Sequence, residues 1–102
     1  MTRRDALIRV IDTLHGEIAA LKANNVAELE KATSAKLTAI ETLRGLGEGP
    51  AGPELLDLAD EANRLNDTCR IYVNLMAANV RRRLQLLTGE DSNSYRRAPA
   101  YA

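Results

Sequence analysis

The sequence predicts an all-α protein built as a long antiparallel helical hairpin, similar to a coiled coil. Apolar residues recur at helical spacing on both sides of one glycine- and proline-rich break, GLGEGPAGP, at residues 45–53. The aromatic residues are three tyrosines, with no phenylalanine or tryptophan. That composition favours slender packing of helix on helix through leucine and alanine. The length suits a single small domain, which we expect to span residues 1–88.

The first predicted helix spans about residues 2–44 and carries one apolar face. The residues of that face are Leu7, Ile11, Leu14, Ile18, Leu21, Leu29, Ile40 and Leu43. They keep the same phase across Asn24 and Asn25, which favours one continuous helix. Asn25 and Glu28, however, have the spacing of a capping pair that begins a new helix. We expect continuity, and keep a kink or break near Asn24–Asn25, and hence three helices, as the alternative.

The second predicted helix spans about residues 53–88, after a loop at residues 45–53. Pro53 suits its first turn, where a missing N–H is tolerated, and Gly89 suits the position after its last residue. The segment EDSNSYRRAPAYA that follows shows no helical period. We therefore expect residues 89–102 to form a flexible, disordered tail.

This second helix carries two apolar stripes, which we call the inner and the outer stripe. The inner stripe comprises Leu58, Ala62, Leu65, Cys69, Val73, Met76, Val80 and Leu87. Its spacings of three, four and seven suit packing on the first helix, with Cys69 as a small buried residue. The outer stripe lies nearly opposite and comprises Leu56, Ile71, Leu75, Ala78 and Leu86, with Arg82 inside it. A hairpin buries one face of each helix, so the outer stripe is left to pack on a third helix, on a second copy of the chain, or on a helix of another protein.

Composition and motifs exclude several classes of function. Fourteen basic and fourteen acidic residues cancel, which argues against a nucleic-acid binder. One cysteine and one histidine cannot supply a zinc ligand set, and no cofactor motif is present. His15 lacks the neighbours of a phosphotransfer histidine, and we expect no enzymatic activity. With no signal-peptide pattern and no apolar run of membrane-spanning length, we expect a cytoplasmic protein that does not insert into membranes.

Several segments resemble the FlgN family of flagellar type III secretion chaperones. The first is ALKANNVAELEKATSAKLTAIETL at residues 20–43, with a small polar break followed by a lysine and spaced leucines. The others are Leu65–Asn66 near the start of a long helix, the arginines and leucines of 81–87, and Tyr95 in the tail. The resemblance covers most of the chain.

The resemblance implies a binding function. Such chaperones hold the hook-associated (hook–filament junction) proteins, prevent their premature assembly and deliver them to the type III export apparatus. In this chain Ile71, Leu75 and Leu86, with Ala78 beside them, would cover an amphipathic cargo helix. Asn74 and Arg82 would set its orientation, and the tail around Tyr95 would order on binding. The alternative is a structural coiled-coil module that forms a homo-oligomer through the outer stripe and has no role in export.

Overall fold

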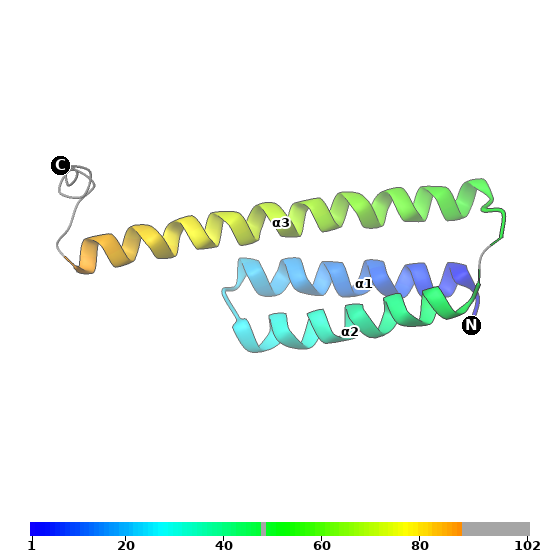
Figure 1. Ribbon diagram of the computed structural model, residues 1–102, viewed down its shortest axis with the longest axis horizontal. Helices are drawn as coiled ribbons and strands as arrows, with labels where there is room; N and C mark the ends of the chain where they lie inside the picture. The colour runs from blue at the N-terminus through cyan, green and yellow to red at the C-terminus, as the bar shows by residue number, and fades with distance from the viewer. Residues whose placement is uncertain (48, 89–102) are drawn as a thin grey trace. The chain divides into compact units, whose positions relative to one another are not determined.

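The computed structural model describes residues 1–47 and 49–88, which form three α-helices. They are α1 (Arg3–Lys22), α2 (Val26–Gly45) and α3 (Pro53–Leu87) (Figure 1). These described residues contain no strand, so the predicted all-α class is confirmed. The predicted bounds of the last helix, 53–88, agree with α3 to within one residue. The predicted tail at 89–102 lies outside the described residues.

The chain divides into two compact units, Met1–Tyr72 and Val73–Ala102. In the first unit α1 and α2 are antiparallel neighbours joined by a short connection (Figure 1). The part of α3 up to Tyr72 runs parallel to α1, because its contacts advance along both helices in the same order. Arg4 contacts Glu54, and Lys22 lies over the ring of Tyr72. The first unit is therefore an up-down-up arrangement of three helices.

The expected continuity of the first helix through Asn24–Asn25 is wrong, and the alternative of a break that gives three helices is confirmed. Two local motifs end one helix and begin another. Asn24 adopts the left-handed conformation at φ 56°, and its N–H donates to the carbonyl of Leu21 at 3.1 Å. The N–H of Asn25 donates to the carbonyl of Ala20 at 2.9 Å, which completes a Schellman termination of α1. The Asn25 side chain then accepts from the Glu28 N–H at 3.1 Å and caps α2.

The apolar phase did not reveal this break, because both helices turn their apolar faces toward the same core. Most of that core comes from α1, and its largest fully buried side chain is Leu14. The buried apolar residues are Ala6, Val10, Ile11, Leu14, Ala20 and Leu21 of α1, Ala39 of α2 and Cys69 of α3. Since α1 supplies six of these eight residues, it is the helix on which the other two pack.

The start of α1 is secured by a capping box that the prediction did not name. The Thr2 hydroxyl accepts from the Asp5 N–H at 3.1 Å, and the Thr2 N–H donates to the Asp5 carboxylate at 3.2 Å. The bond from the Thr2 backbone lowers the pKa of the Asp5 carboxyl, followed by the bond from the Thr2 side chain. Local side-chain chemistry thus defines where α1 begins, as it does for α2.

The cap at Asn25 can be tested by substitution. Replacing Asn25 with alanine removes the acceptor for the Glu28 N–H, and should lower the free energy of unfolding by about 1 kcal/mol. Urea unfolding followed by circular dichroism at 222 nm measures the loss. Asn24→Gly is the matched control, because glycine accepts the left-handed conformation of residue 24 without strain. Equal losses in the two variants would contradict a specific capping role for Asn25.

Candidate helix-binding surfaces

A buried carboxylate lies where the three helices of the first unit meet. Glu17 of α1 is a buried charged residue, and its side chain is only 5% exposed. From α2, the Thr33 hydroxyl donates to this carboxylate at 2.8 Å and the Lys36 ammonium approaches it at 3.1 Å. The Lys36 side chain is itself 20% exposed. A carboxylate so far from water is tolerated only because these donors replace its hydration.

The thiol of Cys69 brings α3 to the same cluster. Its sulfur lies 3.6 Å from Oε1 of Glu17 and 3.8 Å from the carbonyl oxygen of Leu14. Burial raises the pKa of the Cys69 thiol, and the Glu17 charge and hydrogen bond raise it further. The group therefore stays a protonated donor and is a poor nucleophile, in agreement with the predicted small buried residue.

The cluster of Glu17, Thr33, Lys36 and Cys69 is structural, because its members satisfy one another. Among the described residues no buried side-chain polar atom lacks a hydrogen-bond partner. The sequence prediction missed the cluster, although a signal was present. Glu17 continues the spacing of Val10, Leu14 and Leu21 on α1, and Lys36 lies between Leu29 and Ile40 on α2. Opposite charges at core positions of neighbouring helices indicate a buried ion pair.

A double-mutant cycle tests this pair. Lys36→Met leaves Glu17 buried without a counterion and should lower the free energy of unfolding by about 3 kcal/mol. Glu17→Met should cost less, because the partly exposed Lys36 can turn to water. The double variant should come within about 1 kcal/mol of the native chain, since two methionines fill the space without charge. Additive losses in urea unfolding would show that the two residues are not coupled.

The Cys69 thiol should make stability depend on alkaline pH. The folded-state pKa is raised above its ordinary value of 9.0, so the neutral thiol stabilises the fold below that pH. This contribution is lost as the pH rises through the raised folded-state pKa. Urea midpoints measured between about pH 8 and pH 10 should fall more steeply for the native chain than for Cys69→Ala, which has no thiol to ionise. Parallel pH profiles would contradict this assignment.

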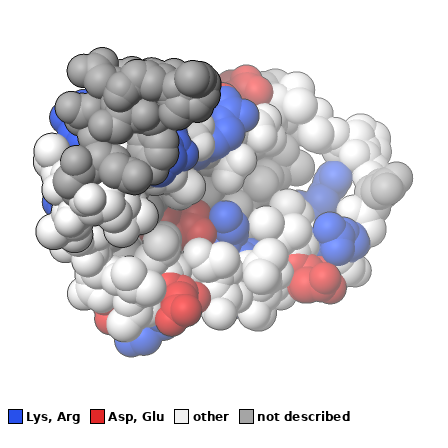
Figure 2. All heavy atoms as spheres, turned by 60° about the vertical axis from the view of Figure 1, so that its left-hand side comes forward, with Lys and Arg blue, Asp and Glu red and all other residues white. Residues whose placement is uncertain are grey.

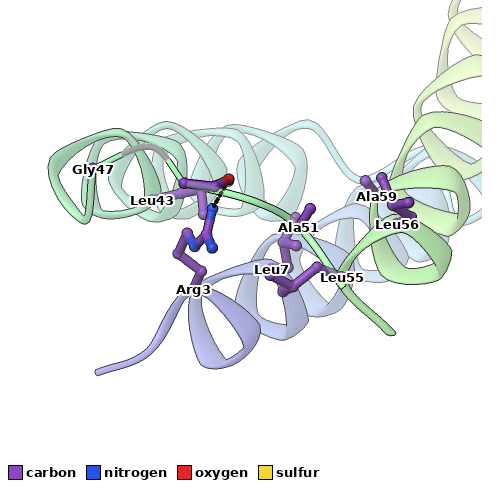
Figure 3. A pocket seen from close by; sticks show the side chains of 9 residues that line it. Arg3, Leu7, Leu43, Gly47, Ala51, Leu55, Leu56 and Ala59 are labelled. Carbon is purple, nitrogen blue, oxygen red and sulfur yellow. Dashed lines mark hydrogen bonds between the residues drawn. The ribbon is translucent and has the colours of Figure 1, made fainter. Parts of the chain in front are cut away.

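A cavity of about 320 Å³ opens at the end of the first unit that carries the α2–α3 loop (Figure 3). Leu7, Leu43, Leu55 and Leu56 are among its lining residues. The Arg3 guanidinium donates to the carbonyls of Gly49 and Pro50, at 3.1 and 2.9 Å, and holds the loop against α1. Because the Arg3 guanidinium is occupied by these two hydrogen bonds, the cavity is lined mainly by aliphatic side chains. Leu56 is the member of the predicted outer stripe that lies here.

The predicted partner-binding residues on α3 are exposed. Ile71 and Leu75 are each 56% exposed and Leu86 is 74% exposed. Asn74, Ala78 and Arg82 are also exposed. Each of these side chains is therefore accessible to a partner. Tyr95, the last predicted residue, lies outside the described residues.

The inner stripe behaves differently from the prediction in its second half. Leu58, Ala62 and Leu65 are half-buried and Cys69 is buried, as expected, and Met76 is also half-buried. Val73, Val80 and Leu87, predicted to pack on the first helix, are exposed. Helices α1 and α2 have 20 residues each, about 30 Å, whereas α3 has 35, about 52 Å.

The prediction also missed Leu84, which is exposed and shares the sector of the inner stripe on a helical wheel. We name the stretch Val73–Leu87 of α3 the C-terminal segment. Its exposed large apolar residues are Val73, Leu75, Val80, Leu84, Leu86 and Leu87. Six exposed aliphatic side chains within one stretch of α3 are typical of a surface that binds another protein.

Charge distribution, potential metal ligands and helix hydropathy are further properties of the described residues. On the face drawn in Figure 2, basic and acidic side chains lie in small groups separated by uncharged areas. His15 is exposed on α1. No cluster of three or more potential metal-ligating side chains occurs in residues 1–47 and 49–88. In the same residues no helix combines the length and hydropathy needed to cross a membrane.

Comparison with known proteins does not assign the chain to a family. No family model, curated protein or solved structure matches it.

Proposed function

We propose that this chain is a flagellar export chaperone that binds hook-associated (hook–filament junction) proteins, prevents their premature assembly and delivers them to the type III export apparatus. The observation that carries the proposal is the set of exposed aliphatic side chains on α3. The resemblance of the sequence to the FlgN family supplies the identity of the cargo. Such a chaperone would act in the cytoplasm, before its cargo is exported.

The binding mode that fits α3 is the docking of one amphipathic helix along another. Ile71 and Leu75 are four residues apart and lie on one side of the helix. Covering their remaining exposed area would supply roughly 1 kcal/mol or more for each residue. The same contact would shield the apolar side of a cargo helix, and that shielding is what prevents premature assembly.

A structural module that self-associates is the second candidate. The same exposed residues favour it, because two copies of α3 could cover one another. The two functions differ in what the apolar surface meets: hook-associated proteins in the first case, and the chain itself in the second.

Replacing both Ile71 and Leu75 with aspartate tests the leading proposal. Charges at these exposed positions should reduce capture of hook-associated proteins at least tenfold while helicity is kept. Capture is measured by pull-down from motile cells of the native source with mass spectrometry. The matched control is Val26→Asp with Leu37→Asp, two equally exposed apolar residues on α2, which should leave capture unchanged.

The same experiment separates the two candidates. If the native chain captures no hook-associated protein during motile growth, the chaperone proposal fails. A tight dimer that Ile71→Asp with Leu75→Asp converts to a monomer, measured by light scattering, would in that case support the structural module.

A further inference from the structure

The C-terminal segment carries charge of one sign. Arg81, Arg82 and Arg83 are exposed, and residues 73–87 contain no acidic residue. By contrast, residues 53–72 of the same helix contain five acidic and two basic residues. None of the ion pairs found among the described residues includes Arg81, Arg82 or Arg83. Residues 73–87 therefore carry three positive charges and no negative charge.

The three arginines lie around the helix in different directions, because successive residues are about 100° apart. Arg82 lies within the outer stripe, Arg81 lies on a polar side between the two stripes, and Arg83 lies at the edge of the inner stripe, in line with Leu65. Asn74 and Gln85 share the side of Arg81. The segment therefore has two opposite apolar faces, one with an arginine at its edge and the other with an arginine inside it.

This pattern argues against two occupants of the surface. A helix that lies on a membrane needs one apolar face and one charged face, whereas this segment has two apolar faces. Pairing of the segment with the same segment of a second copy would bring two arginine triplets near each other at the middle of an antiparallel contact, or side by side in a parallel one. Like charges in contact oppose such pairing.

We propose that the C-terminal segment binds an acidic amphipathic helix of another protein, with aliphatic residues along its seam and Asp or Glu at the flanking positions. The proposal rests on the chaperone function, since it names the chemistry of the cargo helix. Flanking acids would pair with Arg81 and Arg83, in the manner of the charges that select partners in coiled coils. All three arginines lie within one turn of α3. The acidic residues that pair with them would therefore lie near one end of the cargo helix.

Two designed peptides test the proposal. Both have the same length and the same leucines at heptad a and d positions, and they differ in carrying glutamate or lysine at e and g. Fluorescence anisotropy with the full chain should show the glutamate peptide binding about tenfold or more tightly than the lysine peptide. The preference should shrink as salt is raised, because exposed ion pairs are screened.

Substitution of the arginines provides the decisive comparison. Arg81→Gln, Arg82→Gln and Arg83→Gln together should abolish the preference for the glutamate peptide and keep the helix, since glutamine is a good helix former. The matched control is Arg9→Gln, Lys31→Gln and Arg44→Gln on α1 and α2, three exposed residues whose loss changes the net charge equally. The control should retain the preference.

Several outcomes overturn the inference: equal binding of both peptides, no binding of the glutamate peptide, or the same loss in the control as in the arginine variant. Stronger binding to phosphatidylcholine–phosphatidylglycerol vesicles than to the glutamate peptide would show a membrane surface instead. Unchanged capture of hook-associated proteins by the arginine variant would overturn only this inference. Absence of capture by the native chain would overturn only the chaperone proposal, because the peptide preference is measured separately.

Discussion

The carboxylate of Glu17 is the point at which the three helices of Met1–Tyr72 meet. Donors reach it from α2 through Thr33 and Lys36, and from α3 through Cys69. Apolar side chains alone allow helices to slide by a turn with little penalty, whereas a buried charge tolerates only the register that satisfies it. Helix α1 is the centre of the unit, because it provides both the carboxylate and most of the apolar core.

A short core follows from the connection at Ala23–Asn25. Because α1 ends at Lys22 and α2 returns beside it, neither helix matches the length of α3. In the observed fold Val73, Val80 and Leu87 are exposed together with the outer stripe.

The exposed side chains of α3 are the feature of this chain that a proposed function must explain. Exposed aliphatic side chains on opposite sides of one helix, with arginines beside them, are suited to binding other helices. The polar side chains around Glu17 hydrogen-bond one another, and the pKa of the Cys69 thiol is raised. The cluster therefore stabilises the fold. Both proposals rest on the exposed aliphatic side chains of α3, and the chaperone proposal takes the identity of its cargo from the resemblance to the FlgN family.

The sequence by itself determined the helical class, the loop near residues 45–53, the extent of α3 and the exposure of the outer stripe, because these depend on local periodicity, glycine and proline. The capping signals at Asn24 and Asn25 were also local, but an unbroken apolar phase fits a straight helix and a folded-back pair equally well. Only the tertiary structure decided between them, and it also showed that Val73, Val80 and Leu87 are exposed. It alone joined Glu17 to Lys36 and Cys69, because contacts between distant residues depend on how the helices pack and not on their individual patterns.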